Sequence, residues 1–331
     1  MQHAIPLDLE SIKKLFSKKF LLVITISIPS AIFADYFNVP LAWMIGPMIA
    51  VSIAALNGLK IFMPRLALSS ILIILGLHIG NYIDQNLFSQ MVNWIWTTII
   101  MLGYIVVSIV IVSKYLQKFS GYNEKTSIFS AAPGALGPLM ILAEYEKSDL
   151  SQVATAHLIR LIIIITVFPF IIVNLSASDT LEIQKFDYMS QNHWNLVLLI
   201  IASIIFIFFF DKAKIPAALL SGTLVASGIL QIFDIASYKL PDASINFCLL
   251  ILGASVGCRF ANKTVKEVAN NSFHGLVATI LLVLLGLLAA FIATFFVDNS
   301  FLTLILSFCP GGIYEVAVIA IAFDLEPDFV A

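Results

Sequence analysis

Two short stretches decide the fold, Ala132-Pro-Gly-Ala135 in the first half of the chain and Cys309-Pro-Gly-Gly312 in the second. The first interrupts an apolar run near residues 127–145, and the second interrupts one near 301–323. Proline removes a backbone donor, and glycine permits backbone angles that other residues avoid. Inside a membrane such breaks are tolerated only where protein buries them or where they line a wet cavity. The stretches therefore predict a matched pair of interrupted helices, either re-entrant or spanning.

The spacing between these two stretches recurs elsewhere in the chain. Leu75-Gly-Leu-His-Ile-Gly80 matches Leu252-Gly-Ala-Ser-Val-Gly257 at the same offset. Pro40-Leu-Ala-Trp-Met-Ile-Gly46 matches Pro216-Ala-Ala-Leu-Leu-Ser-Gly222 at an offset that is shorter by a single position. These matches indicate an internal duplication. If each copy crosses the membrane five times, the odd number inverts the second copy, which is a pattern typical of secondary transporters.

The composition places the chain in a bilayer. Hydrophobic residues make up 60% of the 331 residues and charged residues 11%, against roughly 45–50% and about 25% in soluble domains. The surplus apolar surface must face lipid, so we expect an all-α polytopic membrane protein. The net charge of -2 and the lack of a basic stripe argue against direct binding to nucleic acid.

Apolar runs of about 20 residues are long enough to cross a bilayer. They fall at 20–37, 40–57, 66–83, 91–113, 151–174, 194–211, 215–233, 244–262 and 274–297. Lys13, Lys14, Lys18 and Lys19 precede the first run without the pattern of a cleavable signal peptide, so the N-terminus is expected in the cytoplasm. If the Pro-Gly stretches enter and return on one side, the lysines and arginines gather on cytoplasmic loops, which favours re-entrant stretches.

The resulting organisation has four parts. Residues 1–19 form a cytoplasmic N-terminal segment, 20–175 a first membrane repeat, 176–193 an external loop and 194–331 a second membrane repeat. The first repeat ends in a helix that continues to about residue 174, and its counterpart would lie beyond residue 331. The prediction is thus an inverted repeat of five plus five helices, with one Pro-Gly-interrupted helix in each half and the last helix of the second half missing.

The chain resembles the membrane-bound AbrB duplication family of bacterial proteins. The resemblance rests on the Pro-Gly stretch, the His157-x-x-Arg160 that follows it, the Leu-Gly-x-x-x-Gly helices and the duplication. It covers nearly the whole chain from about residue 20, apart from the missing final helix. Members are labelled as regulators of gene expression or as ammonia monooxygenases. The resemblance implies a multi-pass protein of the bacterial cytoplasmic membrane.

Three groups of residues are candidates for a substrate or ion site. The breaks at Pro133-Gly134 and Pro310-Gly311-Gly312 free backbone groups, and the helix that opens after each break directs its positive end at an anion. His157 and Arg160 share one helical face and could bind an anionic group, although Arg160 is near enough to the helix end to reach water instead. Glu315 is either an ion- or proton-coupling carboxylate or the partner of a neighbouring span; its counterpart is Pro138.

Four glycines have a different expected role. Gly76, Gly80, Gly253 and Gly257 recur at a spacing that lets helices approach closely, so they are predicted to be packing residues.

These features favour a secondary transporter of an unknown small solute, whose transport could be coupled to that of an ion. The other expected partners are the lipid bilayer and a second copy of the chain. The alternative is a membrane sensor that affects gene expression indirectly, without transport. An oxygenase needs clustered ligands, whereas His3, His78, His157, His193 and His274 are scattered along the chain. We therefore expect no enzyme activity, no metal and no cofactor.

Overall fold

The computed structural model describes residues 9–83, 87–134, 136–175, 193–215, 217–236, 238–261 and 263–330. Every regular element in these ranges is a helix, which confirms the predicted all-α class. The first half holds α1 (Leu9–Leu15), α2 (Lys18–Tyr36), α3 (Ala42–Leu56), α4 (Arg65–Gly80), α5 (Leu87–Ser120), α6 (Glu124–Ala131), α7 (Leu136–Tyr145) and α8 (Leu150–Leu175). The second holds α9 (His193–Lys212), α10 (Ala218–Ile232), α11 (Asp242–Cys258), α12 (Val265–Ala293), α13 (Phe301–Ser307), α14 (Ile313–Ala322) and α15 (Pro327–Val330). The predicted external loop lies outside the described residues except for His193.

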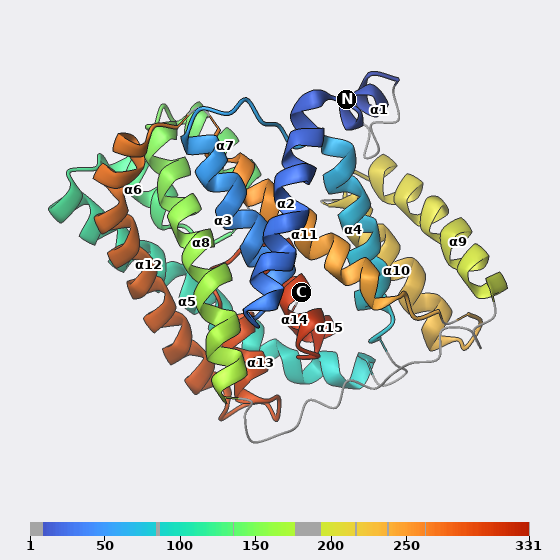
Figure 1. Ribbon diagram of the computed structural model, residues 1–331. Helices are drawn as coiled ribbons and strands as arrows, with labels where there is room; N and C mark the ends of the chain where they lie inside the picture. Colours follow the sequence, from blue (N-terminus) through green and yellow to red (C-terminus); the bar gives the residue numbers. More distant parts are fainter. Residues whose placement is uncertain are drawn as a thin grey trace.

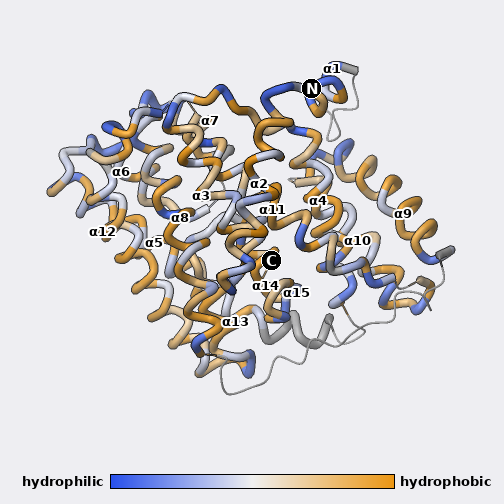
Figure 2. Tube along the Cα trace, viewed as in Figure 1, coloured by the Kyte–Doolittle hydropathy of each residue, from blue (hydrophilic) through white to orange (hydrophobic). Residues whose placement is uncertain are grey.

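Among the residues that the structure describes, five helices are long and apolar enough to cross a membrane, in keeping with the expected polytopic membrane protein. They are α2, α9 and the parts of α5, α8 and α12 at Trp94–Ser120, Leu150–Leu175 and Ser272–Ala293. Figure 2 shows hydrophobic residues along the middle of these helices and hydrophilic residues gathered toward their ends. The chain is therefore a membrane protein by the length and composition of its helices.

Four of the nine predicted spans are shorter than expected. α3 and α10 have 15 residues each, α4 has 16 and α11 has 17. At about 1.5 Å per residue these helices extend roughly 22–26 Å, less than the roughly 30 Å of a bilayer's hydrocarbon core. The apolar residues that lengthened the predicted spans lie in the connections at either end.

The ends of these helices share unusual backbone angles. Leu41 precedes α3 with φ of 50°, and Ala217 precedes α10 with φ of 51°. Left-handed residues also recur at Asn38 and Lys214, at Gly58 and Asp234, and at Lys147 and Asp324. The members of each pair occupy matching positions in the two halves of the chain. The local geometry thus repeats at the offset found in the sequence.

Apart from the short N-terminal α1, the helices that the structure describes fall into two sets. The crossed set consists of α2, α3, α4, α9, α10 and α11, and the break set consists of α5 to α8 and α12 to α15. In the crossed set α3 packs most closely on α11, and α4 packs on α10, so each half of the chain lies against the other. The break set lies beside it, with α5, α8 and α12 on the left of Figure 1. Contacts between the sets are sparse; the main ones join α14 to α4 and α11, and α8 to α3 and α11.

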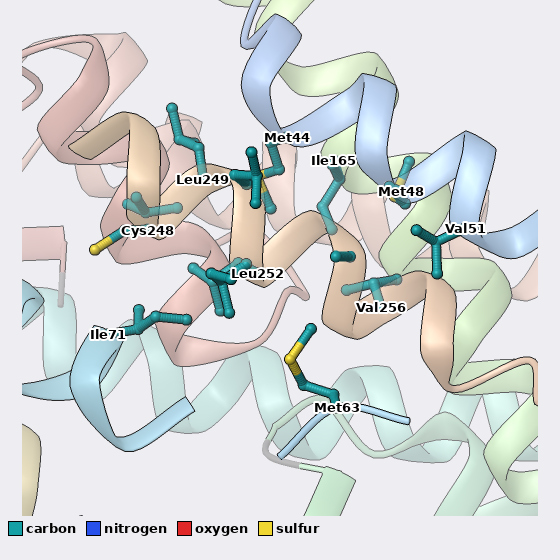
Figure 3. Close-up of a cluster of buried hydrophobic side chains, with 14 of the residues drawn as sticks. Met44, Met48, Val51, Met63, Ile71, Ile165, Cys248, Leu249, Leu252 and Val256 are labelled. Carbon is teal, nitrogen blue, oxygen red and sulfur yellow. The ribbon is translucent and has the colours of Figure 1, made fainter. Parts of the chain in front are cut away.

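Apolar side chains fill the centre of the crossed set. Figure 3 shows Leu249, Leu252 and Val256 of α11 among Met44, Met48 and Val51 of α3 and Ile71 of α4. Ile165 of α8 joins the same cluster from the break set. The boundary between the two sets is therefore mainly apolar, so a charged group buried there is costly unless it is paired or hydrogen-bonded.

Candidate functional site

The first break lies between α6 and α7. α6 ends at Ala131, Ala132 and Pro133 are not helical, and Gly134 has φ of 137°, an angle that L-residues rarely adopt. Because the helix stops, the Ala132 carbonyl has no partner in a following turn. It instead accepts hydrogen bonds from both terminal nitrogens of Arg160, at 3.2 and 3.1 Å.

Arg160 lies inside the protein. Its side chain comes from the middle of α8 and the residue is only 3% exposed, so it does not extend to water. Both of its hydrogen bonds within the described part of the chain go to Ala132, and no acidic side chain there forms an ion pair with it. A fully buried guanidinium is thus held by one carbonyl.

His157 occupies the preceding turn of α8 and is 2% exposed. Its Nδ1 lies 2.9 Å from the Val153 carbonyl, and because a carbonyl can only accept, Nδ1 carries the proton. The Ala132 carbonyl lies close to the same ring. The other nitrogen, Nε2, is buried and makes no hydrogen bond to the residues that the structure describes.

The second break lies between α13 and α14. α13 ends at Ser307, and α14 begins at Ile313 with Gly312 as its N-cap. In the break, the amide of Gly311 donates to the Cys309 carbonyl at 2.8 Å, while Pro310 is buried and has no amide to donate. Gly286 of α12 permits the Phe308 carbonyl to approach, since a Cβ there would lie 2.7 Å from that oxygen.

Glu315 closes the second break. It is 3% exposed, lies in the first turn of α14 and folds back over Gly312. A carboxylate in this position is favoured by the positive end of the helix. Its Oε1 lies 3.6 Å from a terminal nitrogen of Arg259, which follows α11 and is one-third exposed. This ion pair joins the break set to the crossed set.

Helix α8 brings the two breaks together. Arg160 binds the first break, and Ile164, one turn later, faces the second: a Cβ on Gly311 would lie 3.7 Å from Ile164 Cγ2. The Cys309 side chain lies within electrostatic range of Arg160, and Arg259 lies within that of His157. The structure therefore gathers Pro133-Gly134, His157, Arg160 and the segment Pro310 to Glu315 around one helix.

Comparison with known proteins identifies the family. A family model described as "Transition state regulatory protein AbrB" matches residues 43–331. The chain belongs to the AbrB family. It is 22% identical to "Uncharacterized protein YhjN" of Bacillus subtilis (strain 168) over 343 residues, which covers 94% of this chain and 87% of that protein. It is 25% identical to "Putative regulator AbrB" of Escherichia coli (strain K12) over 291 residues, covering 86% and 82%.

The four predicted packing glycines of this AbrB-family chain lie away from the breaks. A Cβ on Gly80 would lie 2.4 Å from the Ser227 Cβ of α10 and 2.8 Å from the Leu224 carbonyl. Gly76 meets α10 in the same way, at Thr223 and Leu220. Gly253 lies against the Met44 carbonyl of α3, and Gly257 lies against Val51. These glycines therefore allow α4 to pack closely on α10, and α11 to pack closely on α3.

Two residues of the site escaped the sequence reasoning, Arg259 and Tyr104. In the sequence Arg259 is one of several positive charges that follow apolar runs, and its partner Glu315 lies on a helix much later in the chain. Tyr104 is 6% exposed; its hydroxyl donates to the Leu282 carbonyl of α12 at 3.2 Å, and its ring lies edge-on to Phe308 at 6.2 Å. A lone glutamate in one apolar helix and an arginine directly after another were the available signal for the ion pair.

Proposed function

We propose that this AbrB-family protein is a secondary transporter that moves a small solute across the bacterial cytoplasmic membrane, and that it catalyses no reaction. The observation that carries the proposal is the meeting of both breaks on successive turns of α8. Free backbone groups, a buried arginine and a buried glutamate occupy that place, where a structural bundle would bury apolar side chains.

The proposal includes an inverted repeat with a cytoplasmic N-terminus, five crossings in the first half and one broken or re-entrant helix per half. Its support is the recurrence of left-handed residues at the two offsets found in the sequence, which differ by a single position, and the exchanged packing of α3 on α11 and α4 on α10. A two-fold relation between halves produces such an exchange. α15 begins at Pro327, which stands at the repeat offset from Leu150, the first residue of α8.

Movement is proposed at the boundary between the helix sets. Glycine contacts hold α4 on α10 and α11 on α3, so the crossed set would move as one body. The boundary with the break set is smaller, and Glu315–Arg259 is the ion pair that crosses it. Rocking or sliding of one set against the other would expose the breaks alternately to the two sides of the membrane.

A flux measurement tests the proposal. Purified protein in proteoliposomes is offered panels of carboxylates, amino acids, sugars and nucleosides under imposed proton or sodium gradients. We expect gradient-dependent uptake of at least one solute class, lost in Gly134→Ala and in Gly311→Ala. Gly103→Ala is the matched control, because Gly103 lies on an exposed face of α5 with no atom within 4 Å of an added Cβ. Uptake that survives in both break variants would refute the proposal.

A membrane sensor is the second candidate, suggested by the description of the family as regulatory and by the name of the Escherichia coli relative. Such a sensor would act on gene expression indirectly, through a partner, without binding nucleic acid itself. It predicts that a solute stabilises the protein while no solute accumulates in proteoliposomes. Binding and flux measured on one preparation therefore separate the two candidates.

A further inference from the structure

The charge around the breaks does not balance. Arg160 and Arg259 each carry one positive charge, and Glu315 is the acidic group of the described residues that faces them. Glu315 already lies beside Arg259 and in the first turn of its own helix. The Ala132 carbonyl supplies only a partial charge to Arg160. A guanidinium buried from water without a counter-charge is costly, so a mobile anion is the expected partner.

Unused hydrogen-bonding groups of Arg160 and His157 also indicate that a ligand binds beside them. A guanidinium carries more N–H groups than the two that bind Ala132, so further donors of Arg160 are left over. One turn earlier, Nε2 of His157 is buried without a partner among the described residues. Since Nδ1 holds the proton, Nε2 of the neutral ring is an acceptor. The pair therefore offers donors for an anion beside an acceptor for a neutral O–H group.

We propose that the transported solute is a small carboxylate that also carries a hydroxyl group. The carboxylate would bind the free N–H groups of Arg160, whose planar fork matches its two oxygens. The solute's hydroxyl would donate to His157 Nε2. This inference rests on the proposed transport function and names the class of solute that the same site accepts.

Other small solutes fit less well. An amino acid would bring its ammonium group toward Arg160 and Arg259, where like charges repel. A sulfate ion has more acceptor oxygens than one arginine can satisfy, and it offers His157 no hydroxyl. Phosphate keeps a hydroxyl near neutral pH, but it brings up to two negative charges to one arginine that lacks a single counter-charge. Chloride would balance the charge of Arg160 but would leave Nε2 unpartnered.

Binding to the full chain in detergent tests the inference without requiring flux. Dissociation constants are measured by titration calorimetry or by thermal stabilisation for the pairs glycolate and acetate, lactate and propionate, and malate and succinate. The controls are glycine, alanine, chloride, sulfate and phosphate. We expect at least one hydroxylated acid to bind about tenfold more tightly than its partner, because the partner leaves the buried acceptor unsatisfied.

Variants connect this preference to the two side chains. Arg160→Lys retains the charge but loses the fork, and should weaken carboxylate binding about tenfold or more. His157→Leu should remove the preference for the hydroxylated acid, and His157→Gln, which restores an acceptor, should recover part of it. His274→Gln is the matched control, because that ring already binds the Tyr115 hydroxyl at 3.1 Å and should leave the preference unchanged.

Three results would overturn the inference. They are equal binding within every pair, tighter binding of an amino acid or inorganic anion, and no binding of any carboxylate in the panel. If uptake of a sugar or nucleoside is observed while the carboxylates fail to bind, the transporter proposal stands and the solute class is wrong. If hydroxylated acids bind with the predicted preference but are not taken up, the solute class stands and the protein is a sensor.

Discussion

The two breaks share a Pro-Gly interruption of the helix but differ in the charge of the side chain that lies against them. At the first, Pro133 and Gly134 end α6, and a buried arginine binds the freed carbonyl of Ala132. At the second, Pro310 precedes α14, and a buried glutamate covers the freed end at Gly312. The first break exposes the negative end of a helix to a cation, and the second exposes a positive end to an anion.

If the two segments are copies of one unit, as proposed above, this difference lets them form one asymmetric site. Glu315 stands at the repeat offset from Pro138, which carries no charge. Both segments thus contain a Pro-Gly break, whereas the buried carboxylate belongs to the second segment and has proline at the matching position of the first. Glu315 has a cationic partner, whereas Arg160 has none among the acidic side chains that the structure describes.

The largest expected effect is a difference in stability between substitutions of Arg259 and of Arg160. Arg259→Leu leaves Glu315 buried without a partner and should lower the free energy of unfolding by about 2–3 kcal/mol, less than a fully buried pair because Arg259 is partly exposed. Arg160→Leu removes a buried charge that lacks a counter-charge, which offsets the lost bonds to Ala132, so the change should stay within about 1 kcal/mol. Equilibrium unfolding in mixed detergent micelles measures both.

A second substitution controls this comparison. Glu315→Gln added to Arg259→Leu should restore most of the lost stability, because the amide no longer needs a cation. An equal loss in the two arginine variants, or no recovery in the double variant, would show that the breaks do not differ in charge balance.

The two break glycines should differ as well. Gly134→Ala places an L-residue at φ of 137° and should cost about 1–2 kcal/mol although no atom obstructs the new Cβ. At Gly311 the φ is unexceptional, and the new methyl group must displace Val316 Cγ2, 2.5 Å away. Alanine also lowers the entropy of the unfolded chain, which offsets part of the free-energy cost of moving Val316. Gly311→Ala should therefore lower the free energy of unfolding by less than about 1 kcal/mol. The same unfolding assay compares the free energies of unfolding of the two variants. A larger loss in Gly311→Ala than in Gly134→Ala would mean that the second break is the strained one.

The sequence predicted these features unevenly. The breaks, the duplication offset and the His157–Arg160 face were visible because proline, glycine and an arginine in an apolar run each have a local meaning. The lengths of α3 and α10 were not, because left-handed residues such as Leu41, Ala217 and Asp234 limit them, and nothing local favours that conformation in leucine or alanine. The inward direction of Arg160 and its choice of Ala132 depend on how α8 packs on α6, which residue spacing does not specify.

A titration should distinguish the entrances to the two interrupted segments. Tyr122 precedes α6, and burial together with Asp149 raises its pKa from the ordinary value of 10.0 to about 12; its counterpart is Asn299, which does not titrate. A raised pKa favours the protonated form in the folded state, so this stability is complete below about pH 10 and is lost as the pH rises toward about 12. Tyr122→Phe should flatten the decline of melting temperature over that interval, while Asn299→Ala should leave its slope unchanged. An unchanged slope in Tyr122→Phe would contradict the assignment.

The smallest effect concerns the bonds that tie the ends of each interrupted segment together. Lys125 pairs with Glu146 through an exposed salt bridge at the outer ends of α6 and α7, whereas Asn299, just before α13, donates to Glu326, just after α14, at 2.9 Å. An exposed ion pair contributes about 0–1 kcal/mol and is screened by salt, while a bond from a neutral amide is much less sensitive to ionic strength. Glu146→Gln should therefore lower stability at low salt and approach wild type near 1 M salt, where the screening length is about 3 Å. Glu326→Gln, which keeps an acceptor for Asn299, should change little at either salt concentration. Melting curves at both concentrations give the comparison, and a salt-dependent loss in Glu326→Gln would mean that the second segment is also closed by charge.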